Sequence, residues 1–568
     1  MGNFIKTQKS FINGEVSPTF FTNDNLNGLS RMENLDVMSG GGLVRRPGLK
    51  KIAKLPANAR LVPFSVDENQ EYIIAIMNGC LRIFSNDTFV QDVIAPWGTN
   101  DIKSVQYAQR FGTMIFVHPD YAPRVLRKAN GTFQLSEFTF SSTSDNYIVN
   151  MPFTHFADSD GITITVTSSD EGVHLTTNQA FWTANNVGGH LMLLGKTWII
   201  LSYVSATDVI ATCNGAYTLP ADPVSDWQEA TFSPRRGWPS CITFHQDRLV
   251  FGGAKSWPAG IWMSRVGEHT NFNTGTGLDD DAIYFTLLSG RRQHVCTLVS
   301  SDSLQILTSE GEWVVSSTPV TPTSISIKMH TTIGSVSDIY LPAQQMEGKT
   351  VFVSHNKKEI RELVLDALGE NYNANNLCEL SNHLMNNPID IAYNKTNKKL
   401  FVVMDAGYMA VMNYNPGLNI AAWGRYTTNG TFCSVAVSDT YTYVVAKRNQ
   451  EYFLEKFVAS EMVDADTKSV QINASGIPLM SSGHNTHHTR IKKIVARVHN
   501  TKTLLINNMR AILPQEVYDD AADGFYGDVS MNVLGTNELG VETPWSISTT
   551  DAMPIKILSI TIYGRYQI

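Results

Sequence analysis

Charged residues are scarce in this chain of 568 residues: Asp, Glu, Lys and Arg together make up 17%, against 43% hydrophobic residues. This balance excludes a disordered chain, which combines high charge with low hydrophobicity. The net charge is −8, so the chain lacks the basic excess of a protein that coats nucleic acid. The composition is that of a globular protein with apolar residues for two or three cores.

Cysteine is also sparse, and its spacing is informative. The six cysteines are scattered, with no Cys-x-x-Cys pair among them. A disulfide framework or a zinc site would bring cysteines together at short spacings. We therefore expect no metal site, reduced and buried thiols, and synthesis in a reducing cytoplasm. These cysteines are Cys80, Cys213, Cys241, Cys296, Cys378 and Cys433.

Long apolar runs are missing as well. The opening residues Met1–Lys6 contain no apolar core of a secretory signal. The most apolar run, Leu191–Val204, is interrupted by Lys196 and is shorter than the roughly 20 residues that a membrane helix needs. We expect neither a secretory signal nor a membrane span.

Catalytic motifs are not found either. There is no Gly-x-Ser-x-Gly elbow and no Trp-Asp dipeptide of WD repeats. The segment Thr308–Trp313 resembles the Asp-containing turn of sialidase propellers, but it lacks the Asp and occurs once. Gly195-Lys196-Thr197 has His190 where a phosphate loop needs its first Gly, and it runs into the apolar strand Trp198–Leu201, which favours a hairpin. We expect no enzyme activity and no cofactor.

Short alternating segments separated by turns are what the sequence does contain. Arg60–Phe64, Glu71–Met77 and Leu81–Phe84 predict three strands, and Asn78-Gly79 predicts a tight hairpin turn between the last two. A similar unit, Val105–Phe140, has its own Asn-Gly turn at residues 130 and 131.

Units of this kind recur at intervals of roughly 30 to 45 residues, the spacing of propeller blades. We therefore predict an all-β chain built on a β-propeller of about seven blades, with six as the alternative. Helix is expected only in Glu359–Leu365 and in parts of Ala374–Met385. The later units are Ser240–Phe272, Cys296–Val315, Ile339–Leu365, Ile389–Tyr426 and Thr431–Phe457.

Two stretches break the blade pattern. Residues 151–235 contain strands such as Ile162–Val166 but do not form a blade, which predicts a β domain inserted into the propeller. After about residue 466 the alternation of Ile491–Val498 and Ile555–Tyr563 predicts a terminal β-sandwich or small barrel. The predicted organisation is an N-terminal arm (1–50), propeller (51–150), inserted domain (151–235), propeller (236–465) and C-terminal β domain (466–568).

A series of small motifs follows a fixed order in the second half of the propeller. The order is the feature that matters, because each motif alone is weak. The motifs are Arg236-Gly237-Trp238-Pro239, Asp247–Gly253 with Arg248, Ser264-Arg265, Asn271-Phe272-Asn273, Asp279-Asp280-Asp281, Leu304–Thr308, Gly311-Glu312-Trp313 and Thr321-Pro322.

This ordered set resembles the nozzle, or tail tubular B-type, proteins at the lower end of the tail in short-tailed phages. The opening of the chain is similar to that family too, through Asn13–Pro18, Asn34 and Gly40–Gly48. Two readings of the glycine-rich opening stay open: a turn entering the first strand, or an assembly arm. In the second reading Arg45 and Arg46 would bind carboxylates or carbonyls of a neighbouring subunit.

The resemblance marks residues that we treat as candidates for assembly contacts. Asp279–Asp281 with Arg265 could serve between subunits, although a solvated turn is the main interpretation. The candidates are Asn34, Arg45, Arg46, Arg236, Arg248, Arg265, Asp279, Asp280 and Asp281.

Two further clusters have weak ligand patterns. Asp158–Gly161 begins like a calcium loop but lacks the later acidic ligands, so an Asp-rich turn is favoured. His484, His487 and His488 with Arg490 fit a metal site poorly, and a solvated loop is favoured.

The resemblance implies a structural protein of the virion tail. Copies would form a ring, expected to be a hexamer, around the channel through which double-stranded DNA leaves, without sequence-specific binding. Partners would be the tail adaptor, portal-side proteins, and tail fibres or spikes. The alternative is a carbohydrate-binding or carbohydrate-degrading propeller of the virion, and a third is a host protein-interaction propeller.

Overall fold

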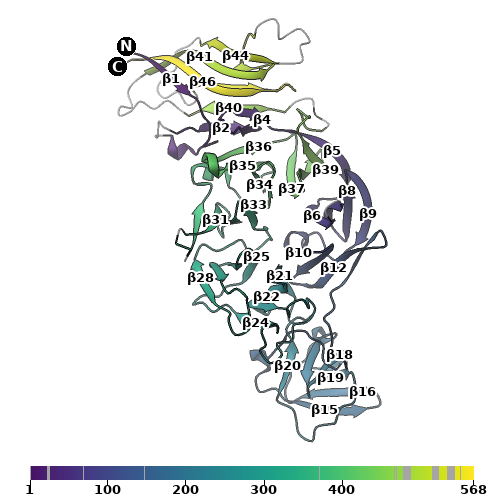
Figure 1. Cartoon of the computed structure of the whole chain (residues 1–568). Helices are drawn as coiled ribbons and strands as arrows, with labels where there is room; N and C mark the ends of the chain where they lie inside the picture. Colours follow the sequence, from purple (N-terminus) through teal and green to yellow (C-terminus); the bar gives the residue numbers. More distant parts are fainter. Residues whose placement is uncertain are drawn as a thin grey trace.

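The computed structural model describes residues 2–567 except 22–25, 68–69, 146, 367, 370, 466, 468–469, 478–487, 514–523, 534–543 and 551. Three β modules lie in a row: a C-terminal sandwich, a propeller in the middle, and the inserted domain at the far end (Figure 1).

The central module is a seven-bladed β-propeller, which confirms the predicted fold class. Each blade has four antiparallel strands, and the inner strands of most neighbouring blades pack against one another. Blades 1 to 3 are β6 (Arg60–Asp67), β7 (Gln70–Met77), β8 (Cys80–Ser85) and β9 (Thr88–Ile94); β10 (Gln106–Arg110), β11 (Thr113–His118), β12 (Tyr121–Ala129) and β13 (Thr132–Glu137); β21 (Pro239–His245), β22 (Arg248–Ala254), β23 (Trp257–Met263) and β24 (Ile283–Thr286).

The remaining blades complete the ring. Blades 4 to 7 are β25 (Val295–Ser300), β26 (Leu304–Thr308), β27 (Glu312–Val315) and β28 (Ile327–Thr331); β29 (Gln344–Met346), β30 (Lys349–Val353), β31 (Ile360–Leu365) and β32 (Tyr372–Asn376); β33 (Pro388–Asn394), β34 (Lys399–Met404), β35 (Met409–Asn415) and β36 (Ile420–Tyr426); β37 (Thr431–Ser438), β38 (Tyr441–Arg448), β39 (Glu451–Val458) and β5 (Gly48–Leu55).

The Asn-Gly turns lie where the sequence places them. Met77 pairs with Cys80 across Asn78-Gly79, so these two residues make a two-residue hairpin. A two-residue hairpin also forms at residues 130 and 131, where both φ angles are positive, 51° and 81°. The hairpin predicted at Lys196 is also present, because Leu193 pairs with Lys196.

The propeller is closed by a strand from the N-terminal side of the chain. β5 is the outer strand of blade 7 and pairs antiparallel with β39, Tyr452 facing Leu55 and Val458 facing Gly48. β5 is followed at once by β6, the inner strand of blade 1. The first and last blades are therefore locked together by main-chain hydrogen bonds.

The inserted domain leaves the propeller between β13 of blade 2 and β21 of blade 3. Its seven strands form one antiparallel sheet around a core that contains Trp182, Trp198 and Trp227. Its strands, in sheet order, are β14 (Phe153–Thr154), β20 (Trp227–Ala230), β17 (His190–Leu193), β18 (Lys196–Ser205), β19 (Asp208–Cys213), β16 (Gly172–Thr177) and β15 (Ile164–Ser169).

The C-terminal module is a β-sandwich, as predicted, but it takes strands from both ends of the chain. The two sheets share one core, in which Phe11 packs edge-on against Trp545 with ring centroids 6.3 Å apart. One sheet contains β1 (Gly2–Gln8), β3 (Leu35–Val37), β4 (Leu43–Arg45), β46 (Lys556–Gln567), β41 (His488–Thr501) and β44 (Phe525–Asn532); the other contains β2 (Leu29–Glu33), β40 (Ile472–Gly476), β45 (Ser546–Thr549), β42 (Leu505–Ile506) and β43 (Met509–Arg510).

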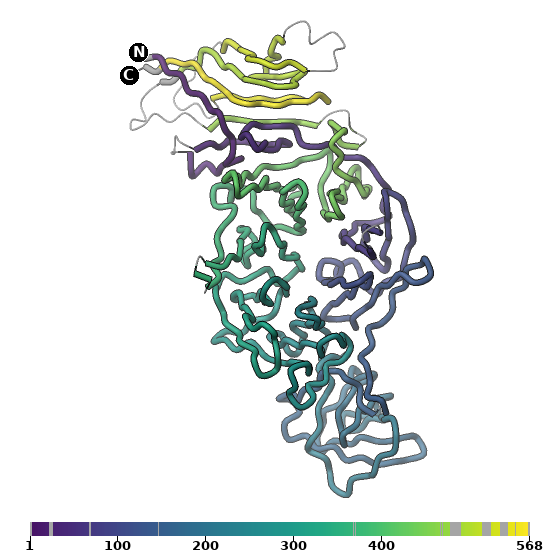
Figure 2. The backbone as a smooth tube through the Cα atoms, viewed as in Figure 1, coloured from purple at the N-terminus to yellow at the C-terminus, as the bar shows by residue number. Residues whose placement is uncertain are grey.

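The sandwich and the propeller share a sheet. β2 pairs with β36, the outer strand of blade 6, and with β40, so that nine strands run without interruption from β33 to β43. Residues 2–21 and 26–55, which include most of the predicted N-terminal arm (1–50), contribute strands to both modules. β1, near the N-terminus, pairs with β46, near the C-terminus, in the sandwich (Figure 2).

Side chains from blades spread around the ring meet near the propeller axis. Arg60 of blade 1 donates to the carbonyl oxygen of Val105 (2.6 Å), and its guanidinium lies 4.9 Å from the ring centroid of Tyr340, which leads into blade 5. The charge of Arg60 also acts on Tyr107 of blade 2 and on Asp390 of blade 6, and burial raises the pKa of Tyr107 to about 12. Arg60 therefore links blade 1 to blade 2 and to the segment that leads into blade 5.

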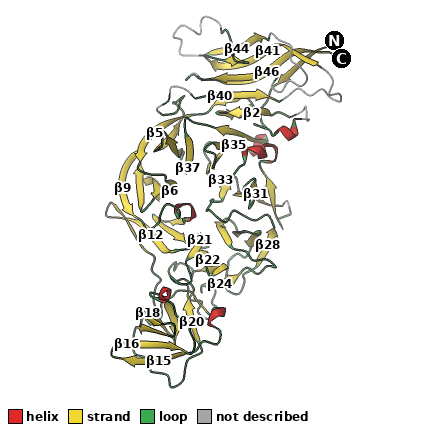
Figure 3. Ribbon diagram, turned by 180° about the vertical axis from the view of Figure 1, so that it is seen from behind, coloured by secondary structure: helices red, strands yellow, loops and turns green. Residues whose placement is uncertain are grey.

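Helix is confined to short 3-10 turns among the described residues (Figure 3). The prediction of helix at Glu359–Leu365 was wrong: Ile360–Leu365 is β31, held by ladders to β30 and β32 that outweigh its helix-favouring charged residues. In the part of the chain that the structure describes, no helix is long and apolar enough to cross a membrane. The 3-10 turns are η1 (Pro18–Phe20), η2 (Ile102–Ser104), η3 (Ala157–Ser159), η4 (Ala184–Asn186), η5 (Glu379–Leu384) and η6 (Pro416–Leu418).

Candidate functional site

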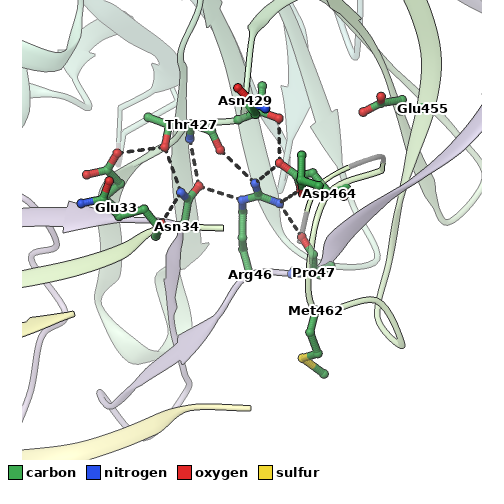
Figure 4. Close-up of polar contacts among 12 residues, drawn as sticks. Glu33, Asn34, Arg46, Pro47, Thr427, Asn429, Glu455, Met462 and Asp464 are labelled. Atoms are coloured by element: carbon green, nitrogen blue, oxygen red, sulfur yellow. Dashed lines mark hydrogen bonds and ion pairs between the residues drawn. The ribbon is translucent and has the colours of Figure 1, made fainter. Parts of the chain in front are cut away.

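Asn34 and Arg46 lie side by side where the propeller meets the sandwich (Figure 4). Asn34 connects β2 to β3 with φ of 55°, a left-handed conformation that Asn tolerates better than most residues. Its buried side chain accepts the N–H of Thr427 (2.9 Å) and donates to the carbonyl oxygen of Gln471 (2.6 Å). One amide thus joins the end of β36 to the segment that enters β40.

Arg46 uses all five of its N–H donors inside the chain. Its guanidinium forms a two-pronged ion pair with Asp464, at 2.9 Å and 2.8 Å. Nε donates to Oδ1 of Asn34 (2.8 Å), and the remaining donors reach the carbonyl oxygens of Pro47 (2.8 Å) and Thr427 (2.9 Å). Arginine is the side chain that can make such a set, because its donors lie in one rigid plane.

This ion pair is withdrawn from solvent. The side chains of Arg46 and Asp464 are 1% and 0% exposed. The guanidinium also lies 5.3 Å from the ring centroid of Tyr426 and 5.6 Å from that of Phe457. Each charge is neutralised by the other in a setting where an unpaired charge would be costly.

Arg45 and Arg46 lie at a junction between two modules of one chain, and the contacts that the assembly-arm hypothesis gave to a neighbouring subunit are made within the chain. Arg45 is 6% exposed and donates to the carbonyl oxygen of Met462 (3.0 Å), so both arginines bind groups of their own chain. The expected chemistry, arginine on carboxylates and carbonyls, is present. Two of the partners, Met462 and Asp464, come from the loop that follows β39 of blade 7.

The opening motif Asn13–Pro18 forms a second contact at the same joint. Gly14 has φ of 60°, and a Cβ there would overlap the carbonyl oxygen of Trp423, which explains the glycine. The buried carboxylate of Glu15 pairs with Arg425, contacts Nε2 of His383 (3.1 Å) and accepts the N–H of Met32 (2.8 Å). Burial opposes ionisation of Glu15, but these partners outweigh it and lower its pKa.

This pKa shift gives the joint a pH dependence. The folded pKa of Glu15 is below that of the unfolded chain, so its stabilisation is complete above about pH 4.3 and is lost as the pH falls through the folded pKa. We expect Glu15→Gln to lower the free energy of unfolding by about 2 kcal/mol at pH 7 and to have a smaller effect near pH 3, where part of this stabilisation is lost. Urea denaturation at both pH values measures this.

The control for that measurement is Glu310→Gln. Glu310 lies 3.4 Å from Arg291, which is 83% exposed, so this change should cost little at either pH. Equal effects of the two substitutions at pH 7 would contradict the role of Glu15.

Arg236 holds the inserted domain against the propeller. Its guanidinium forms a two-pronged ion pair with Asp158 (2.7 Å and 2.9 Å) and also pairs with the buried Glu229. It lies 3.9 Å from the ring centroid of Phe156, and the neighbouring Arg235 also reaches Asp158 (3.0 Å). Burial opposes ionisation of Asp158, but the ion pairs with Arg236 and Arg235 outweigh burial and lower its pKa. The carboxylate binds arginine where a calcium loop would bind a metal cation.

The side chain of Arg248 binds the main chain of the acidic run Asp279–Asp281. This fully buried side chain donates to the carbonyl oxygens of Asp279 (2.7 Å), Asp281 (2.5 Å) and Ser264 (2.8 Å). The carboxylate of Asp281 accepts the N–H groups of residues 276–278 at 2.9–3.0 Å. Arg265 pairs with Asp280 (2.6 Å), so the solvated turn that we expected holds for Asp279 and Asp280, whereas Asp281 is buried.

These clusters bind parts of the chain to one another. No three His, Cys, Asp or Glu side chains come together as metal ligands among the described residues. His484 and His487 lie outside the described residues, as does the side chain of His488. Asp464 is a functional residue that the sequence did not predict, because a single Asp in a loop belongs to no recognisable motif. The sequence could indicate only that a buried arginine needs a carboxylate partner.

No protein-family model matches the chain, and a search of curated proteins gives no match. Among solved structures the chain is similar to BamB from Moraxella catarrhalis, with 11% identity, a TM-score of 0.35, and 72% of this chain and 97% of that chain covered. The β-propeller domain of Cps50 (Swd1) from Myceliophteria thermophila gives 6% identity, a TM-score of 0.36, and 72% and 99% coverage. The similarity is in fold.

Proposed function

We propose that this chain is a structural subunit of a phage tail: a nozzle-type protein whose copies form a ring around the DNA ejection channel and carry other tail proteins. The main observation that supports the proposal is that several residues of the nozzle-like motifs are buried where two modules of the molecule meet. Asn34, Arg46 and Glu15 fasten the sandwich to the propeller, and Arg236 fastens the inserted domain. A subunit that transmits load between other proteins needs its modules fixed in this way.

The shared sheet supports the same proposal. Nine strands pass from blade 6 into the sandwich, so bending at this joint would break main-chain hydrogen bonds. A long, stiff subunit with different modules at its two ends suits a platform that meets an adaptor on one side and fibres or spikes on the other.

The packing of Arg60 bears on where DNA would pass. Arg60 of blade 1 reaches the ring of Tyr340, which leads into blade 5, and we therefore propose that the channel runs between copies in the ring. The net charge of −8 suits such a wall, because like charge keeps DNA from adhering during passage. No cofactor is needed for this role.

Electron microscopy of the purified full chain tests the proposal. We expect rings, with six copies as the resemblance implies, and the same ring coaxial with the tail in particles. A chain that stays monomeric at all concentrations and is missing from the tail axis would overturn the proposal.

A further inference from the structure

A pocket of about 450 Å³ opens at the seam between blade 7 and blade 1, where β5 closes the propeller. This volume is in the range of small-molecule sites. Its apolar side is made by Ile52 of β5, Ile73 of β7 and Phe84 of β8. Its other side is polar and comes from both blades, so the pocket exists only in the closed ring.

Asp87 and Lys456 line the pocket, and their charges are paired with one another. Asp87 lies in the two-residue turn between β8 and β9, where both residues have positive φ (48° and 62°). Both of its oxygens lie 2.7 Å from Nζ of Lys456, Lys50 approaches to 3.3 Å, and the hydroxyl of Tyr443 donates at 3.3 Å. A small ion would have to displace one of these partners.

The other polar groups that line the pocket include the carboxylates of Glu71 and Asp439 and the hydroxyls of Ser438 and Tyr441. Oε2 of Glu71 accepts the hydroxyl of Ser438 (2.6 Å), and among the described residues Oε1 has no hydrogen-bond partner. Tyr441 is 50% exposed, with Lys456 lying 4.3 Å from its ring centroid. Asp439 is exposed at the rim.

We propose that this pocket binds a neutral saccharide. A sugar ring has an apolar C–H face and an edge of hydroxyls, which correspond to the exposed ring of Tyr441 with the side chain of Ile52, and to the carboxylates of Glu71 and Asp439. Sugar hydroxyls donate strong hydrogen bonds to carboxylates. An anion would face three carboxylates, Glu71, Asp87 and Asp439, with the nearest ammonium, that of Lys456, already paired to Asp87.

This site goes beyond the ring proposal and does not depend on it. A tail subunit that holds a sugar of the cell surface in an interblade pocket would add a contact to adsorption. We assign saccharide binding to this pocket, and no cleavage of the saccharide.

Saturation-transfer NMR and calorimetry on the full chain test the assignment. The probes are glucose, galactose, N-acetylglucosamine and lactose, and we expect saturable binding of at least one with a millimolar Kd. Tyr441→Ala and Glu71→Gln should each weaken that binding about tenfold. Tyr526→Ala, which removes a tyrosine that is 66% exposed in the sandwich, should leave it unchanged.

Three results would overturn the assignment. The first is that no probe binds in a saturable manner. The second is that Tyr441→Ala and Tyr526→Ala bind the probe as the parent chain does. The third is release of glucose or galactose from lactose, since that would make the pocket a hydrolytic site. None of these measurements depends on ring formation. A failure of the saccharide assignment is therefore distinguishable from a failure of the proposed function.

Discussion

Replacing Arg46 with alanine should lower the free energy of unfolding by about 3–5 kcal/mol, because Asp464 would be left buried without its counterion. Both side chains are almost fully buried, and Thr427 and Asn34 would lose hydrogen bonds as well. Urea denaturation followed by tryptophan fluorescence measures the loss, with Trp545 and Trp423 reporting from the two modules that meet at the joint.

A matched control is available on the surface of blade 1. Arg82 forms a two-pronged pair with Asp92 at 2.8 Å and 2.7 Å, like Arg46, but the two side chains are 25% and 41% exposed. Arg82→Ala should therefore cost at most about 1 kcal/mol. If the two alanine variants lose the same stability, burial is not what makes the Arg46 pair important.

This expectation differs from that of the assembly-arm hypothesis. Under that hypothesis, loss of the two arginines would weaken assembly more than folding. With Arg46 enclosed in its own chain, folding of the joint should suffer first, and any assembly defect should follow from it.

Removal of the inserted domain should abolish rings and tail attachment while the propeller still folds. The N–H of Thr231 donates to the carbonyl oxygen of Pro152 (2.9 Å), so Phe153–Ala230 can be replaced by a short Gly/Ser linker without moving the flanking strands. Both acidic partners of Arg236 leave with the domain, and the arginine becomes free to turn to solvent.

The surface of the inserted domain is the reason for expecting an assembly defect. Its strand β18 exposes Ile199, Leu201 and Tyr203 at 37%, 55% and 41%, an apolar stripe on the outer side of the sheet. Circular dichroism and a melting curve check that the shortened chain folds, and electron microscopy checks for rings. Infectious particles that contain the shortened chain would show that the domain is a decoration.

Local patterns made most of the propeller predictable. Alternation and the Asn-Gly pairs determine single hairpins such as β7–β8, because these depend on neighbours in sequence. β31 was misassigned because its isolated propensity is helical, whereas its state is decided by ladders to β30 and β32. Blade 7 could not be completed from the sequence, since its outer strand, β5, lies about 400 residues from β39.

The sequence predicted which residues of the candidate site would make polar contacts, but not which groups they would contact. Asn34, Arg46, Arg236 and Arg248 stand in turn motifs, which marks them as special. Their partners, Asp464 and the main-chain carbonyls of Asp279–Asp281, are brought to them by folding over long sequence distances. Whether an arginine serves its own chain or a neighbour is decided by burial, which the motifs do not encode.

The closing strand has a consequence for how the protein is made. β5 emerges from the ribosome early, but its partner β39 is synthesised about 400 residues later, which at typical rates takes roughly 20–80 s. During that time the hydrogen-bonding edge of β5 and the core residues of the opening segment are without their native partners. The nascent chain should therefore depend on chaperones until blade 7 is complete. Translation of the last blade sets the earliest moment at which the propeller can close.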